Sequence, residues 1–170
     1  MRLALIALLF VGCGVPGGKD GGVDGGTPSW PEGALSVGTI STTSGDGFAP
    51  FGTEVGLTPG AQGGYHVETR YKIVGQSATD VLFTHIVRLT DGGTLVSRGT
   101  RRFDIDTDPW VSENFPVFMC PTPVGVNVAN EFVTFEITAT APDGGLLGRT
   151  GGTTKLRCDP GAYCETICRG

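Results

Sequence analysis

Two histidines are the side chains of this sequence best suited to acid–base or ligand chemistry. His66 alternates with Glu68 and Arg70 in the segment Tyr65–Ile73. In an extended chain these three side chains share one face, where an imidazole, a carboxylate and a guanidinium could contact one ligand. We therefore take His66, Glu68 and Arg70 as candidate ligand-binding residues, with a surface histidine bonded to a turn as the alternative. His85 alternates with apolar residues, so we expect a buried imidazole bonded to the backbone.

Three aspartates, Asp104, Asp106 and Asp108, also alternate. Their carboxylates would lie on one face of an extended chain and repel one another unless a cation or an arginine lies among them. Calcium is coordinated by such oxygens, although the EF-hand pattern is absent. We expect either a calcium site at a sheet edge or a solvated loop, and no other cofactor. In the second case the aspartates would pair with neighbouring arginines, which are Arg98, Arg101 and Arg102.

Four cysteines near the C-terminal end predict covalent cross-links. They are Cys120, Cys158, Cys164 and Cys168. An even set in an exported chain is typical of disulfides, and four cysteines allow three connectivities. We expect Cys120 to pair with Cys158 and Cys164 with Cys168. A structural zinc site made of the same four thiolates is the alternative.

The elements that must position these residues have the patterns of strands. Tyr65–Ile73 and Glu131–Ala141 both alternate with a period of two, which indicates half-exposed antiparallel strands. Further short strands are predicted, and Ala162–Cys168 could form one helical turn. These strands are Leu35–Thr43, Thr53–Thr58, Phe115–Cys120 and Thr153–Cys158.

The segment Val81–Ile105 predicts a hairpin around a turn at Asp91-Gly92-Gly93. A three-residue loop pairs Leu89 with Leu95 and Val81 with Phe103, and it usually carries a bulge. A two-residue loop would place arginines opposite apolar residues, so we favour the three-residue loop. Asp143-Gly144-Gly145 predicts a second turn of the same kind.

These strands and a content of 29 glycines and 11 prolines indicate an all-β protein. We expect residues 34–170 to form a single immunoglobulin-like antiparallel β-sandwich, with a jelly roll or a small open barrel as the alternative.

One strand of the hairpin carries apolar side chains on both faces. Leu82 and Ile86 lie opposite the face of the other apolar residues, and Phe132 adds an outward apolar group on another strand. An exposed apolar strip would indicate a partner surface. The alternative is that the loop Asp106–Pro116, which contains Trp110, covers it.

The N-terminal segment has the layout of an export signal. An apolar stretch, Leu3–Val11, follows Met1 and Arg2 and ends just before Cys13. Phe10-Val11-Gly12-Cys13 resembles the lipobox of bacterial lipoproteins. The resemblance implies that residues 1–12 are removed and that Cys13 carries the lipid. Residues 13–33 are then a Gly-, Pro- and Asp-containing tether, which contains too little apolar material to form a core.

Two further observations concern location. Gly14 follows Cys13, where an aspartate would resemble an inner-membrane retention signal, so we expect an outer-membrane lipoprotein. The segment Leu57–Val67 contains a Gln-Gly-Gly-Tyr-His run that resembles uncharacterised Gram-negative envelope proteins. A secreted protein without a lipid is the alternative.

The net charge of −5 excludes a general nucleic-acid binder, and the sequence contains no motif of nucleophilic catalysis that we recognise. We expect a non-catalytic role in binding or assembly, with an envelope protein or a glycan as partner. The alternatives are an envelope hydrolase or carbohydrate-active enzyme, and a calcium-stabilised adhesion module.

Overall fold

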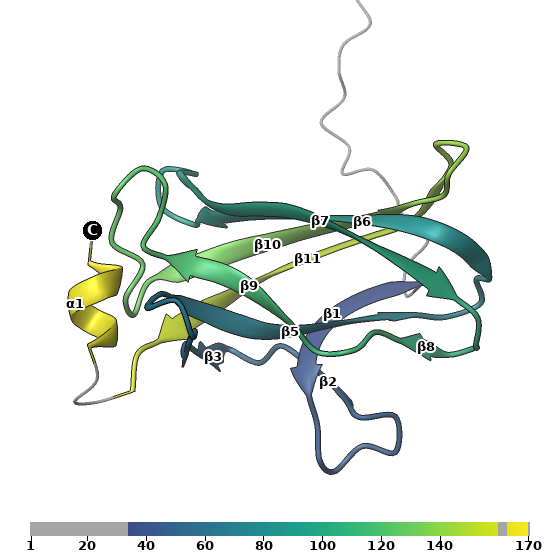
Figure 1. The fold of residues 1–170 in the computed structure, drawn as a ribbon, viewed down its shortest axis with the longest axis horizontal. Coiled ribbons are helices and arrows are strands. Elements are labelled where there is room, and N and C mark those ends of the chain that lie inside the picture. The colour runs from purple at the N-terminus through teal and green to yellow at the C-terminus, as the bar shows by residue number, and fades with distance from the viewer. Residues whose placement is uncertain (1–33, 160–162, 170) are drawn as a thin grey trace, which may run out of the picture.

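The fold is a β-sandwich, seen in a computed structural model that describes residues 34–159 and 163–169. Two sheets face each other across one core, and a short helix, α1 (Cys164–Cys168), lies at one end (Figure 1). The predicted all-β sandwich is thus confirmed, and within the described residues the two sheets do not close into a barrel. The leader, Cys13 and the tether lie outside the described residues. Within these, no helix is long and apolar enough to cross a membrane.

The first sheet is built on both sides of β5, which extends over Tyr65–Ile73 as the alternation predicts. Strands β1 and β4 pair with one edge of β5, β8 and β9 pair with the other, and β2 extends the sheet beyond β1. The bounds are β1 Leu35–Ile40, β2 Phe48–Pro50, β4 Thr58–Pro59, β8 Trp110–Val111 and β9 Phe115–Cys120.

The second sheet has the strand order β3-β11-β10-β6-β7. All its pairs are antiparallel except that of β3 with β11, which is parallel. The bounds are β3 Glu54–Gly56, β6 Ala78–Leu89, β7 Leu95–Ile105, β10 Phe132–Thr140 and β11 Leu146–Arg157. Strand β7 is therefore a free edge of this sheet, as β9 is of the other.

Aromatic side chains dominate the core between the sheets. The ring of Tyr71 stacks on that of Phe83 at 5.0 Å between centroids, and the ring of Trp110 lies 5.5 Å from that of Phe83. Full burial of one such side chain contributes about 1.5–3 kcal/mol. Trp110 is 6% exposed, so it belongs to the core and does not cover the outer face of β6. Burial also raises the pKa of Tyr71 well above its usual range.

The β6–β7 hairpin confirms most of the predicted register. Val81 pairs with Phe103, and Gly92 and Gly93 both adopt positive φ in the turn. The expected pair of Leu89 with Leu95 is wrong, because the register shifts beyond Val87 and places Arg88 opposite Leu95. The shift leaves Val96 as one extra residue on β7, and Leu89 bonds to Thr94 across a four-residue loop instead of the expected three-residue loop.

Two disulfides tie α1 to the sandwich, but the expected pairing is wrong. The bonds join Cys120 to Cys168 and Cys158 to Cys164. Cys158 directly follows the last residue of β11, and Cys164 is the first residue of α1. Cys164 and Cys168 are both buried on the helix, with non-bonded sulfurs 3.9 Å apart, and Cys168 reaches Cys120 at the end of β9.

Candidate functional site

The sequence-predicted pair His66 and Glu68 does come together on the outer face of β5. His66 Nε2 lies 2.7 Å from Glu68 Oε1, and the amide of Asn114 donates a 2.5 Å hydrogen bond to Glu68 Oε2. His66 Nδ1 is buried without a hydrogen-bond partner, and a Cβ at Gly60 would lie only 3.4 Å from it. One ring nitrogen of His66 is thus bonded to Glu68 and the other is buried. Neither is free to bind a ligand, so the role of this cluster is to hold neighbouring side chains in place.

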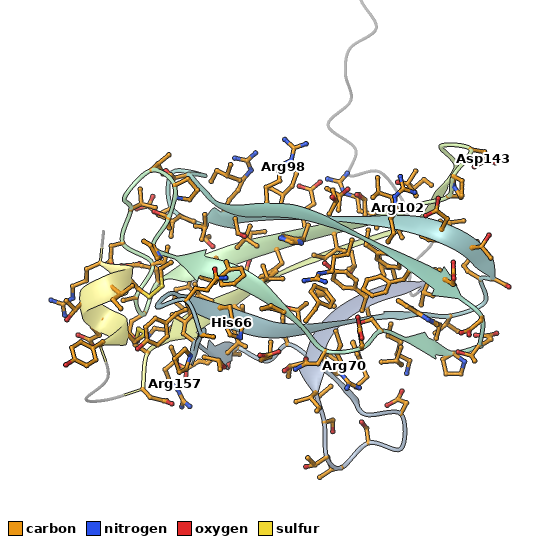
Figure 2. The ribbon with its side chains drawn as sticks, viewed as in Figure 1. His66, Arg70, Arg98, Arg102, Asp143 and Arg157 are labelled. Atoms are coloured by element: carbon orange, nitrogen blue, oxygen red, sulfur yellow. A yellow bond between two sulfur atoms is a disulfide. The ribbon has the colours of Figure 1, made fainter. Side chains whose placement is uncertain are left out.

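Arg70, the third predicted member, does not join this cluster. Its guanidinium donates a 3.2 Å hydrogen bond to the carbonyl of Gly47, in the loop between β1 and β2. Figure 2 shows His66 and Arg70 apart along β5. The neighbouring Lys72 lies 2.7 Å from Asp46 and, with backbone bonding, lowers the pKa of that carboxyl to about 2. Arg70 and Lys72 therefore fasten the β1–β2 loop.

What the His66 cluster supports is an exposed aromatic ring. Phe118 pairs with His66 across the β5–β9 ladder, and the two ring centroids are 5.7 Å apart. Phe118 is nevertheless 51% exposed. An aromatic ring that is held from one side and open on the other is a suitable platform for an apolar ligand surface.

Phe118 borders a cleft of about 520 Å³ between the free edges of β7 and β9. In the part of the chain that the structure describes, strand β7 pairs only with β6, and β9 only with β5, so no ladder joins the two edges. The volume is in the usual range for small-molecule sites. The cleft is lined by His85, Ser97, Arg98, Gly99, Thr100, Arg101, Arg102, Phe103, Glu113, Pro116 and Phe118.

His85 lies on the inner face of β6 and is the most deeply buried polar side chain of the cleft, at 7% exposed. It makes no hydrogen bond to any described residue, and its Nδ1 is buried without a partner, so the expected bond to the backbone is wrong. Gly99 lies directly opposite on β7, and a Cβ there would be 2.7 Å from His85 Cε1. The imidazole therefore lies against the bare backbone of Gly99.

Burial is the main cause that lowers the pKa of His85 to about 4, and the positive charge of Arg101 adds to it. The imidazole is therefore neutral near pH 7. Because Nδ1 is buried, a ligand would bond to Nε2, which donates in one neutral tautomer and accepts in the other.

Arg101 also points to the inner face, opposite Phe83. Its guanidinium lies 5.1 Å from the centre of the Phe115 ring, a cation–π contact that fixes its position at the mouth of the sandwich. Among the described residues, no carboxylate forms an ion pair with it. Arg102 and Arg98 project from the outer side of β7 and form the rim of the cleft (Figure 2).

The expected pairing of these arginines with Asp104, Asp106 and Asp108 is wrong. Arg102 instead bonds to Asp80 at 2.8 Å. Asp104 accepts a hydrogen bond from the backbone N–H of Asp80, and Asp108 accepts one from that of Gly75, so each carboxylate fastens a different turn.

The three aspartate carboxylates also do not gather around one point. In residues 34–159 and 163–169 the one group of three or more close metal-ligand side chains is formed by Cys158, Cys164 and Cys168. All three are buried and engaged in disulfides, so their sulfurs are not free thiolates here.

The proposed apolar partner strip is mostly covered. Leu82 and Ile86 are half-buried, with Arg102 and Arg98 respectively as their β7 neighbours. Phe132 is 52% exposed and lies opposite Lys155. The strip is therefore one exposed phenylalanine rather than a continuous surface.

Comparisons with known proteins leave the site to be judged on its geometry. No protein-family model matches this sequence, and no curated protein matches it significantly. The cleft between β7 and β9 is the strongest candidate site, and sequence reasoning had passed over His85. The signal that could have found it was the glycine opposite a histidine in the hairpin register.

Proposed function

We propose that this chain is a lipid-anchored, non-catalytic binding domain of a bacterial cell envelope, and that its ligand occupies the cleft between β7 and β9. The observation that carries the proposal is the polar lining of that cleft. Among the described residues, His85 has no hydrogen-bond partner and Arg101 has no acidic partner. Buried polar groups are usually hydrogen-bonded, so a ligand in the cleft could bond to the buried His85 ring and to the exposed guanidinium of Arg101.

Binding is favoured over catalysis by the states of the two histidines. Nucleophilic catalysis needs a base bonded to a hydroxyl or thiol and oriented by a third group. His66 is bonded to Glu68, and its other nitrogen is buried. His85 makes no bond to a hydroxyl in the described chain, and its low pKa makes it a weak base at neutral pH.

The anchor and the location rest on the leader. Leu3–Val11 followed by Cys13 supports export, lipid attachment and an outer-membrane location. The two facing sheets and their antiparallel hairpins support an immunoglobulin-like domain presented by the tether.

The anchor is tested by producing the full chain in a Gram-negative host with a radiolabelled fatty acid. We expect label in the protein and its recovery with outer membranes, and we expect Cys13→Ser to lose both. An unlabelled wild-type protein would contradict the anchor.

The cleft is tested by a photo-crosslinking amino acid placed at Phe118 in the living cell. The matched control is Leu146, which is 46% exposed and lies outside the cleft. We expect a reproducible adduct from position 118 alone. Equal adducts from both positions, or none from 118, would contradict the binding site. Envelope hydrolysis that His85→Ala abolishes would replace binding by catalysis.

A further inference from the structure

The lining of the β7–β9 cleft also limits the chemistry of the ligand. Ser97 and Thr100 contribute hydroxyl groups, which donate and accept hydrogen bonds, and neither is bonded to a described residue. Arg101 is a pure donor, Glu113 a pure acceptor, and the neutral His85 ring is both. A ligand that satisfies such a mixture must itself carry many groups that both donate and accept, as a saccharide does.

The side chains at the rim of the cleft also favour a saccharide as the ligand. Phe118 presents a half-exposed ring, and Pro116 lies beside it on the outer face of β9. The His66 ring holds Phe118 from one side, and Glu68 and Asn114 hold His66. A rigid aromatic platform next to hydrogen-bonding groups can take the apolar face of a sugar ring.

The charged side chains of the cleft further restrict the charge of the ligand. The cleft is lined by three arginines and one glutamate in a chain whose net charge is −5. Arg102 is paired with Asp80, which leaves Arg101 as the inward cation without a carboxylate. A guanidinium fork matches a carboxylate in geometry and charge. Glu113 would repel a small, highly charged anion such as phosphate, so a single carboxylate on a hydroxyl-rich ligand fits best.

The spacing of the anchors indicates the size of the ligand. Arg101 lies over Phe115 on the inner face of β9, and Phe118 is three residues further along the strand on its outer face, so a ligand that reaches both must pass over the free edge of β9. Three residues of extended chain span about 10 Å, which is more than one sugar ring covers. We infer that the cleft binds an acidic oligosaccharide of at least two units, with a carboxylate on Arg101 and a neighbouring ring against Phe118. This inference rests on the proposed function of the cleft.

The test uses a panel of di- and trisaccharides that contain uronic, sialic or muramic acid, each beside its methyl ester. Esterification removes the negative charge and leaves the hydroxyl groups. Binding to the wild-type chain is followed by amide chemical shifts of a ¹⁵N-labelled sample, which also locate the site. We expect at least one acid to shift β7 and β9 residues and to bind about 10-fold or more tightly than its ester.

Matched variants separate charge from stacking. Arg101→Gln should weaken binding of the acid to the level of the ester and leave the ester unchanged. Phe118→Ala should weaken both alike. The controls are Arg157→Gln, which removes an exposed arginine outside the cleft lining, and Tyr163→Ala, which removes a ring that is 79% exposed and also outside it. Neither control should change binding.

Three results would overturn the inference. One is equal binding of acid and ester, and another is binding that Arg101→Gln leaves unchanged. In either case an adduct from position 118 in the cell would still support the proposed function. The third is that no acid of the panel shifts any cleft residue at millimolar concentration, and with no adduct from position 118 the proposed function would fail too.

Discussion

The contact between Gly99 and His85 can be tested by adding a single methyl group. In Gly99→Ala the new Cβ would lie 2.7 Å from His85 Cε1 and 3.0 Å from Nε2, far closer than a van der Waals contact allows. The ring must move or the two strands must separate. Overpacking of this kind costs about 1–3 kcal/mol. For a domain of this size we expect the melting temperature to fall by roughly 3–10 °C.

The assay is urea unfolding with the disulfides intact, followed by Trp fluorescence and circular dichroism. Gly99→Ala should lower the midpoint and leave the slope unchanged. In a His85→Ala background the same substitution should cost less than about 0.5 kcal/mol, because the clashing ring is absent. The coupling between the two sites is then about 1–3 kcal/mol.

Gly152→Ala is the matched control, since Gly152 lies in β11 of the same sheet and a Cβ there has nothing within 4 Å. It should change stability by no more than about 0.5 kcal/mol. If Gly99→Ala costs as much with Ala at position 85 as with His, the loss comes from the backbone of β7. Our account of the contact between the His85 ring and Gly99 is then refuted.

Two further predictions follow from the structure. His85 has a pKa of about 4 in the folded chain against about 6.5 when unfolded, so between these pH values only the unfolded chain binds the proton. Stability should therefore decrease by about 3 kcal/mol as the pH falls from 6.5 to 4, and His85→Gln should flatten this part of the unfolding profile; an unchanged profile would contradict the buried neutral imidazole. The disulfides close separations of 48 and 6 residues, so their loss should cost about 4 and about 2 kcal/mol respectively. Thermal unfolding of Cys120→Ser/Cys168→Ser and Cys158→Ser/Cys164→Ser should show this order, and a proteolytic peptide that links Cys120 to Cys158 would refute the pairing.

The local sequence pattern was sufficient to predict those strands in which apolar and polar residues alternate clearly. The alternation of apolar and polar residues placed β5 at its observed bounds, because one face is buried and the other is wet. The turn at Gly92 and Gly93 and the pair of Val81 with Phe103 followed from the same rule. In contrast, β8 is only two residues long, too short for an alternating pattern. The position of Trp110 is determined by its packing against the rings of Phe83 and Phe103.

The candidate site was less accessible to sequence reasoning, because it forms where two edges from different sheets meet. His66 and Glu68 were correctly placed on one face, but Asn114 and Phe118, from a distant part of the sequence, decide what the pair does. The cysteine pairing failed for the same reason, since it depends on where β9, β11 and α1 end in space. The apolar neighbours of His85 gave no sign that its ring would lack a partner, and the one signal was the glycine opposite it in the hairpin register.

The absence of any ladder between β7 and β9 in the described chain has a mechanical consequence. To widen the gap between these two strands costs side-chain contacts such as that of Arg101 with the Phe115 ring, whereas to separate paired strands would break a row of hydrogen bonds. The cleft can therefore widen more easily than a hydrogen-bonded pair of strands can separate. It can adjust its width to ligands of different thickness while both sheets keep their registers.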